Sequence, residues 1–177
     1  MREIEIKILE IDRDAVSAAL AALGAAQTFD GTMHALYYDL PGSPLKERGD
    51  ALRLRLEGER AVLALKRHVE DGKAKVREEL EVAVADFDAM RTLLGSLGFA
   101  VWLEMKKHRT RYSLGEVHFD LDRYEDMHAY IPEFLEIEGP DTETVFRHAE
   151  LLGFRREDCR PWDAVRLAGY YAARRAS

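Results

Sequence analysis

Arg2-Glu3-Ile4-Glu5-Ile6-Lys7-Ile8-Leu9 is the stretch that decides the fold. From Glu3 to Ile8 its apolar and charged residues alternate strictly, so the three isoleucines share one face, and the two glutamates and the lysine share the other. Successive side chains of a β-strand point to opposite sides of a sheet. This period of two therefore predicts a strand with one apolar face and one charged face.

Similar alternation marks seven later segments. Turn residues such as Gly42, Gly58 and the Asp71-Gly72 pair separate them. The further predicted strands are His34–Leu40, Ala51–Glu57, Ala61–His68, Ala74–Val84, Val101–Ser113, Glu116–Tyr124 and Glu133–Glu138. Eight strands, most of them joined by short turns, are enough for a closed antiparallel β-barrel, which is the architecture we expect.

Four helices are predicted to flank the barrel. Aspartates that can cap a helix N-terminus precede three of them, and a Leu-Gly pair follows each of these three. The predicted helices start at Asp12 or Asp14, at Asp86 and at Asp141, end at Leu23-Gly24, Leu97-Gly98 and Leu152-Gly153, and are followed by Trp162–Arg175. The expected fold class is α+β, with residues 1–177 forming one domain.

Composition narrows the functional classes. The chain has 177 residues and a formal net charge of −7, which argues against a nucleic-acid backbone as a partner. Cys159 is the only cysteine, and the sequence has neither a signal-peptide pattern nor an apolar run of membrane-spanning length. We therefore expect a cytoplasmic protein without a membrane or nucleic-acid partner. Tyr170-Tyr171 forms an apolar edge that could support a homodimer.

Charged faces recur in most of the predicted strands. The polar face of a sheet is ordinarily its solvated side, but such faces usually mix in Thr, Ser and Asn. Here the charged residues are Arg53, Arg55, Lys66, Arg77, Glu79, Glu81, Lys107, Arg109, Arg111, Asp122, Glu136 and Glu138. If the apolar faces pack against the helices, these residues line the barrel interior. Carboxylates that hold Mg²⁺ or Mn²⁺, and cations that hold phosphate oxygens, would together suit a polyphosphate–metal complex.

An ordered series of motifs resembles a known family. Glu3-Ile4-Glu5-Ile6-Lys7 fits the ExExK motif of the CYTH superfamily, the triphosphate tunnel metalloenzymes. The series continues with Tyr37-Tyr38-Asp39, Leu45-Lys46, Gly49, Ala51–Arg55, Leu63–Arg67, Arg77–Glu81, Lys107–Arg109, Tyr112, Leu121–Arg123 and Phe134–Glu138. This series extends over nearly the whole chain, so we identify the protein by resemblance as a member of that superfamily.

The resemblance implies roles for individual residues. The metal ligands for Mg²⁺ or Mn²⁺ would be Glu3, Glu5 and Glu136, with Glu138 and Asp122 assisting. The triphosphate would contact Lys7, Arg53, Arg55, Lys66, Arg77, Lys107 and Arg109. The expected catalytic set is Glu3, Glu5, Lys7, Asp122 and Glu136. Glu79 and Glu81 could be ligands or ion-pair partners, and Arg111 could face either the interior or solvent.

Within the superfamily, the sequence most resembles the class IV adenylyl cyclase branch. Ile6 stands directly before Lys7, and Tyr37-Tyr38-Asp39 precedes a Leu45–Gly49 stretch typical of that branch. Ala35 and Arg160–Asp163 depart from its pattern. The expected reaction converts ATP into cyclic AMP and pyrophosphate. The alternatives are a triphosphatase that hydrolyses inorganic triphosphate or thiamine triphosphate, and a non-catalytic module that binds polyphosphate or a nucleotide.

Overall fold

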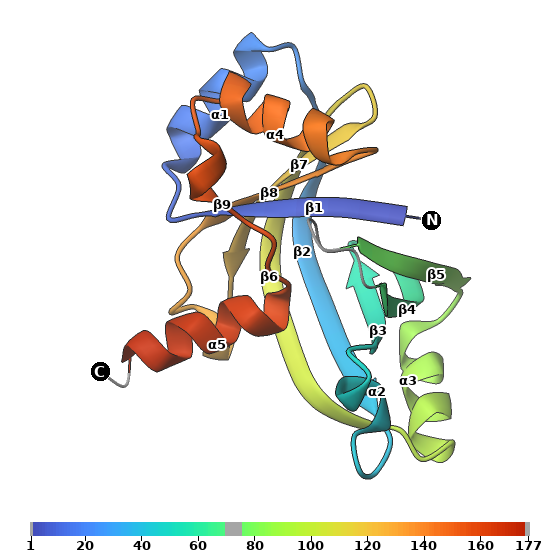
Figure 1. Cartoon of the computed structure of the whole chain (residues 1–177). Coiled ribbons are helices and arrows are strands. Elements are labelled where there is room, and N and C mark those ends of the chain that lie inside the picture. The colour runs from blue at the N-terminus through green and yellow to red at the C-terminus, as the bar shows by residue number, and fades with distance from the viewer. Residues whose placement is uncertain (1, 70–75, 176–177) are drawn as a thin grey trace.

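An antiparallel sheet forms the frame of the molecule (Figure 1). The computed structural model describes residues 2–69 and 76–175, and for residues 2, 3, 68, 69, 76 and 77 only the backbone. Within these residues the strands are β1 (Arg2–Leu9), β2 (Ala26–Asp39), β3 (Ala51–Glu57), β4 (Arg60–Val69), β5 (Val76–Val84), β6 (Ala100–Leu114), β7 (Val117–Tyr124), β8 (Phe134–Gly139) and β9 (Cys159–Arg160). Their order in the sheet is β5-β4-β3-β2-β6-β7-β8-β1-β9, so the predicted antiparallel sheet is confirmed.

Strand β1 has partners on both sides. It pairs with β8 over six residue pairs from Ile4 to Leu9, and its first residues pair with β5 through Arg2–Glu78, Glu3–Arg77 and Ile4–Val76. The β1–β5 pairing covers only one end of β1, so closure of the whole barrel is not established by it. The two-residue β9, which pairs with Lys7 and Ile8, was not predicted because two residues show no period.

The helices in the described residues are α1 (Arg13–Ala22), α2 (Pro44–Glu47), α3 (Phe87–Ser96), α4 (Thr142–Leu151) and α5 (Ala164–Arg175). Asp12, Asp86 and Asp141 cap α1, α3 and α4, because each side chain accepts a backbone N–H three residues later, at 2.7 to 3.0 Å. These three N-termini are thus where the sequence predicts them. None of these helices is long and apolar enough to cross a membrane.

The apolar faces of the strands are covered by helices. In Figure 1, α1 and α4 lie over one face of β1, β7 and β8. Leu20 of α1 and Val145 of α4 are fully buried there with Phe119 and Ile137 of the sheet. Each such side chain contributes about 1.5–3 kcal/mol by leaving water. Because these apolar side chains point toward the helices, the charged residues between them point to the opposite side of the sheet.

The other two long helices lie on opposite sides of the sheet. Leu94 of α3 packs with Leu36 and Leu54 on the apolar face of β2 and β3. Leu167 of α5 packs with Phe134, which lies on the same face of β8 as Glu136, so α5 lies on the concave, charged side.

Strands β2 and β6 are longer than predicted. Their paired register shifts at two places, one between Gln27 and Phe29 and one between Tyr37 and Tyr38. At the second shift Tyr37 pairs with Leu103 and Tyr38 pairs with Val101. Trp102 is therefore an extra residue on β6, as in a β-bulge. Such a bulge interrupts the alternation of faces, so the direction of Trp102 could not be predicted from a period of two.

Candidate active site

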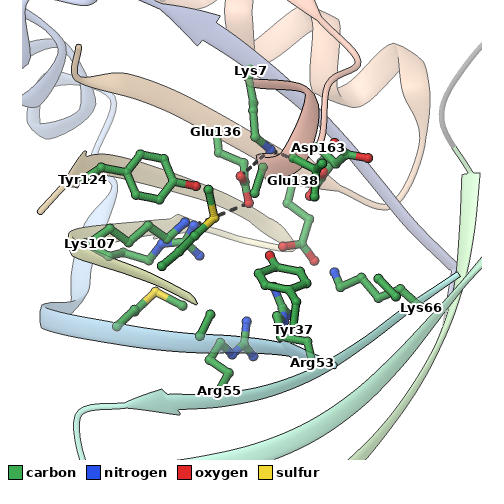
Figure 2. A pocket seen from close by; sticks show the side chains of 18 of the residues that line it. Lys7, Tyr37, Arg53, Arg55, Lys66, Lys107, Tyr124, Glu136, Glu138 and Asp163 are labelled. Carbon is green, nitrogen blue, oxygen red and sulfur yellow. Dashed lines mark hydrogen bonds and ion pairs between the residues drawn. The ribbon is translucent and has the colours of Figure 1, made fainter. Parts of the chain in front are cut away.

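The charged faces of the strands line one cavity of about 210 Å³ (Figure 2). At about 30 Å³ per water, this is room for roughly seven water molecules. Its charged lining residues are Glu5, Lys7, Lys46, Asp50, Arg53, Arg55, Lys66, Lys107, Arg109, Arg111, Glu136, Glu138 and Asp163. The cations outnumber the carboxylates in this lining, although the whole chain has a net charge of −7. The cavity therefore suits a small anionic ligand.

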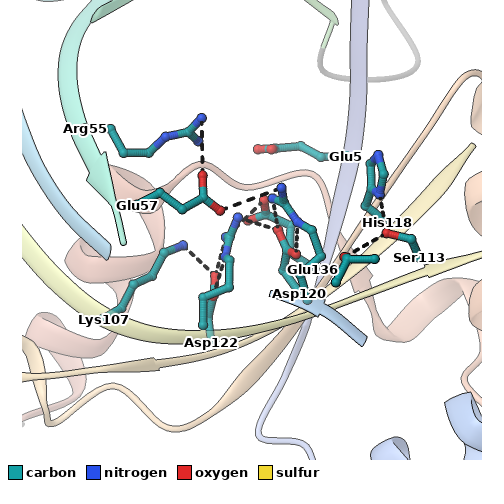
Figure 3. Close-up of polar contacts among 12 residues, drawn as sticks. Glu5, Arg55, Glu57, Lys107, Ser113, His118, Asp120, Asp122 and Glu136 are labelled. Atoms are coloured by element: carbon teal, nitrogen blue, oxygen red, sulfur yellow. Dashed lines mark hydrogen bonds and ion pairs between the residues drawn. The ribbon is translucent and has the colours of Figure 1, made fainter. Parts of the chain in front are cut away.

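A buried layer of ion pairs between β6 and β7 supports the cavity floor (Figure 3). Arg109 donates two hydrogen bonds to Asp122, at 2.7 and 2.6 Å, and Lys107 donates one at 2.5 Å. Arg109 also pairs with Asp120, and Arg111 makes a two-pronged contact with Asp120 at 2.7 and 2.8 Å. Thus the inward position of Arg111, which the sequence left open, is observed.

Asp122 has both of its carboxylate oxygens occupied by these cations. Its side chain is fully buried, and burial alone would raise its pKa. Arg109 and Lys107 outweigh burial and lower the pKa of Asp122 below its ordinary value. In this arrangement Asp122 orients two cations toward the cavity. The role of assisting metal ligand that the family resemblance implies stays a prediction.

Lys7 lies beside the glutamates of β1 and β8. Its Nζ is 2.6 Å from Glu136 and 3.3 Å from Glu5, and its side chain is 3% exposed. Burial would lower the pKa of Lys7, but Glu136 and Glu5 outweigh it and raise that pKa. Burial would raise the pKa of Glu136, but Lys7, Arg109 and Lys107 hold it well below its ordinary value. Both groups are therefore charged at neutral pH.

Two glutamates face each other across the β1–β8 pairing. Glu5 and Glu138 are direct cross-strand partners, and both line the cavity. Like charges placed directly opposite on one sheet face destabilise it unless a cation lies with them. With Glu136, they supply the hard oxygen ligands that Mg²⁺ and Mn²⁺ prefer. The residues thus fit a divalent cation, although no three acidic, His or Cys side chains of the described part are already grouped as a metal site.

A second group of cations comes from β3 and β4. Arg53 and Lys66 share Glu79, at 3.6 and 3.1 Å, and Arg55 lies 3.4 Å from Glu81. Glu79 and Glu81 are therefore ion-pair partners in this structure, one of the two roles that the sequence left open. The side chains of Glu3, a predicted metal ligand, and Arg77, a predicted triphosphate contact, lie outside the described residues.

The positive charge of Arg55 is less well balanced by nearby carboxylates than that of Arg109. Burial lowers its pKa first, and the neighbouring Arg53 and Arg109 lower it further against Glu57 and Glu81. An anion bound in the cavity would offset this repulsion.

Uncharged residues form another wall that the sequence analysis missed. Met33, Ala35 and Tyr37 of β2 and Met105 of β6 line the cavity, and Trp102 lies at the end of this wall. Tyr37 pairs with Arg53, and directly paired residues lie on the same face of a sheet, so Tyr37 points inward. The period of two along β2 could have predicted this direction. Trp102 could not, because the bulge sets its direction.

The family model described as CYTH domain matches residues 1–158. The chain belongs to the CYTH family. A protein of Methanocaldococcus jannaschii named putative adenylate cyclase is 29% identical over 131 residues, which are 74% of this chain and 75% of that protein.

Solved structures agree with the CYTH fold. A Pyrococcus horikoshii protein superposes with a TM-score of 0.77 at 27% identity, covering 93% of this chain and 98% of that one. A Vibrio parahaemolyticus protein named putative adenylate cyclase gives 0.80 at 19% identity, covering 94% and 97%. A Hippeastrum protein, described as having a dominant triphosphatase activity, gives 0.66 at 21% identity, covering 97% and 95%. The last two similarities concern the fold alone.

One wall of the cavity lies beyond the CYTH match. Asp163, Ala164 and Val165, at the start of α5, are lining residues. Asp163 accepts the backbone N–H of Arg166 at 2.7 Å and so caps this helix. The C-terminal helix is therefore part of the candidate site of this CYTH protein.

Proposed function

We propose that this CYTH protein is a metal-dependent enzyme of the class IV adenylyl cyclase type, which converts ATP into cyclic AMP and pyrophosphate. The observation that carries the proposal is the cavity itself, in which Lys and Arg side chains from four strands face the glutamates of β1 and β8. The name of the Methanocaldococcus relative supports the same reaction.

In this proposal the cations bind the triphosphate. The residues are Lys7, Arg53, Arg55, Lys66, Lys107 and Arg109, together with Arg77. Arg109 and Lys107 are already oriented by Asp122, so they need little rearrangement to meet a phosphate oxygen. Charge stabilisation by groups held in place in advance is the main contribution of a protein to phosphoryl transfer.

A divalent cation completes the proposed site. Glu5, Glu136 and Glu138 would hold Mg²⁺ or Mn²⁺, with Glu3 as a further ligand. When bound, such an ion supplies a positive charge that neutralises phosphate oxygens and orients the triphosphate. The proposed catalytic set is Glu3, Glu5, Lys7, Asp122 and Glu136, in which Lys7 holds Glu136 in place and Asp122 holds the cations.

We also propose that the sheet closes into an eight-stranded tunnel around the ligand. The pairing of Arg2–Ile4 with Val76–Glu78 supports this. It joins β1, at one end of the strand series from β5 to β1, to β5 at the other end. A closed barrel has no free strand edge, and it would keep the cations of β3 and β4 opposite the glutamates of β1 and β8.

A triphosphatase is the second candidate. The cavity is small enough that inorganic triphosphate would fill much of it, and a dominant triphosphatase activity is attributed to the Hippeastrum protein of the same fold. In that reaction water attacks the terminal phosphorus and orthophosphate leaves.

Product analysis separates the two reactions. Purified protein is incubated with Mg²⁺ or Mn²⁺ and, in parallel, with ATP, tripolyphosphate and thiamine triphosphate, with EDTA as the metal control. Cyclic AMP and pyrophosphate from ATP are the expected products. Orthophosphate without cyclic AMP would assign the protein to the triphosphatases. Binding of these compounds without any product would support the non-catalytic module instead.

A further inference from the structure

Trp102 has an unusual position for a large apolar side chain. It lines the cavity, yet 37% of it is exposed. The bulge between the Tyr37–Leu103 and Tyr38–Val101 pairs gives β6 one extra residue at this point. Bulges next to functional sites commonly redirect a side chain. Trp102 is thus presented to the cavity and is not packed into the core.

The residues around the Trp102 indole leave it able to stack with a planar aromatic group. The Lys46 ammonium lies 4.8 Å from the centre of the Trp102 ring, and the Tyr37 ring lies 6.0 Å away at an angle of 57°. Lys46 is exposed, so its long side chain can move aside or turn toward a bound anion. Aromatic rings stack on an exposed indole with little dependence on their hydrogen-bonding pattern.

One strip of uncharged residues runs through the charged lining and ends at Trp102. It consists of Met33, Ala35 and Tyr37 of β2, whose cross-strand partners on β3 are Glu57, Arg55 and Arg53. A ligand that contacts both the cations and Trp102 has a polyanionic end and an aromatic end. Inorganic triphosphate has only the first.

We propose that Trp102, with Lys46 beside it, is the platform on which the aromatic head group of an organic triphosphate stacks. This inference rests on the proposed function, because it concerns the same cavity. It adds to that function the residue that would distinguish a triphosphate with a planar heteroaromatic group from inorganic triphosphate.

The two tryptophans of the chain allow a direct test. Trp162 packs against Tyr170, at 4.9 Å between rings, and lies at a second hollow formed by β1, β9 and α5. The variant Trp162→Phe leaves Trp102 as the only indole, and Trp102→Phe leaves Trp162 as the matched control. Each protein is titrated in EDTA, which prevents turnover, with ATP, thiamine triphosphate and tripolyphosphate. Calorimetry measures the binding of each compound independently of fluorescence.

We expect ATP or thiamine triphosphate to quench Trp102 fluorescence, whereas tripolyphosphate binds without quenching it and Trp162 responds to none of them. Which organic compound quenches identifies the head group. ATP and thiamine triphosphate that bind without changing Trp102 fluorescence would overturn the platform and leave the proposed function standing. Failure of all three compounds to bind, both in EDTA and after Mg²⁺ is restored, would overturn the proposed function, and the platform with it.

The variant Trp102→Ala gives a second measurement. Stacking on an aromatic side chain corresponds to a loss of roughly 5-fold to 150-fold in affinity when that side chain is removed. We expect the Kd of the organic triphosphate to rise within this range, while the Kd of tripolyphosphate changes by less than about twofold. The retained tripolyphosphate binding also shows that the variant is folded. An equal loss for both ligands would contradict the proposal.

Discussion

Glu5 and Glu138 oppose each other across two strands that are otherwise well paired. Lys7 contacts Glu5 at 3.3 Å but lies closer to Glu136, at 2.6 Å. The Lys7 ammonium thus forms ion pairs with two carboxylates, those of Glu5 and Glu136. Like charges directly opposite on a sheet face are unfavourable. The proposed divalent cation would offset this repulsion.

Glu5→Gln tests the proposed metal site. The amide keeps the shape of the side chain but removes its charge, so we expect kcat to fall by more than about 100-fold, beyond the range typical for the loss of an outer-shell partner. Circular dichroism should be unchanged. The matched control is Glu104→Gln, an exposed residue of β6 that pairs with His34 outside the cavity lining. Full activity of Glu5→Gln would contradict the assignment.

Arg55→Ala tests the phosphate site on β3. Arg55 is surrounded by Arg53 and Arg109, which lower its pKa after burial, so an anion should bind there readily. We expect KM for the triphosphate to rise by at least about 10-fold, the equivalent of 1.4 kcal/mol. Arg55→Lys should recover only part of this, because an ammonium cannot bind two oxygens in a fixed plane. An unchanged KM for Arg55→Ala would show that this side chain does not contact the substrate.

At the scale of elements, Asp39 fixes the segment that carries Lys46. Its carboxylate accepts the backbone N–H groups of Leu40, Leu45 and Lys46 at 2.8, 3.1 and 3.0 Å. Burial would raise the pKa of Asp39, but these hydrogen bonds lower it. Asp39 thus joins the end of β2 to the short helix α2 and holds Lys46 over Trp102.

Asp39→Ala should release α2 without removing any cavity side chain. We expect KM for the organic triphosphate to rise several-fold while KM for tripolyphosphate stays unchanged. The control is Asp86→Ala, which removes the N-cap of α3 and lowers stability at a site that does not line the cavity. Steady-state kinetics of both variants, with the organic triphosphate and with tripolyphosphate, measure these KM values. If the two variants have the same KM values, α2 has no part in substrate binding.

Most elements could be predicted because their signals are local. Strict alternation indicated the strands, and the aspartate caps indicated α1, α3 and α4. The missed elements depend on distant partners. β9 exists through its pairing with Lys7 and Ile8, and α2 is stabilised by Asp39, neither of which leaves a period in the sequence.

At the scale of the whole molecule, charge is separated between inside and outside. The chain has a net charge of −7, yet most charged residues that line the cavity are cations. The buried carboxylates Glu136 and Asp122 hold these cations, and both have lowered pKa values because of them. The stability of the fold should therefore depend on pH.

We expect the free energy of unfolding to fall in acid. Because the pKa values of Glu136 and Asp122 are lower in the folded state, the unfolded chain takes up protons first, near pH 4 for ordinary carboxylates. Their contribution is present above that pH and is lost as pH falls toward the folded-state pKa, by up to about 1.4 kcal/mol per pH unit for each group. Urea unfolding between pH 3 and pH 7 measures it.

Glu136→Gln should show a shallower dependence on pH than the native chain, because it lacks one of these carboxylates. Glu116→Gln, at an exposed turn between β6 and β7, is the control and should keep the native slope. If Glu136→Gln also keeps the native slope, this carboxylate does not contribute to the acid dependence.

The charged half of the candidate site was predictable, and the uncharged half was not. Parity along each strand placed Lys7, Arg53, Arg55 and Glu136 on the inward face, where they line the cavity. Asp122 also lies inward, but sequence could not show that Lys107 and Arg109 occupy both of its oxygens. Trp102 depends on a register shift between two strands, which a single sequence does not reveal.

The first turn of α5 lines the cavity, although the family match ends before it. The segment that the family model matches is therefore shorter than the segment that lines the cavity, whereas the solved structures of similar fold cover 93–97% of this chain. A fragment cut at residue 158 would keep the cations and glutamates but would lose Asp163, Ala164 and Val165. Exchanging the C-terminal helix would thus change one wall of the cavity and leave its cations and glutamates in place.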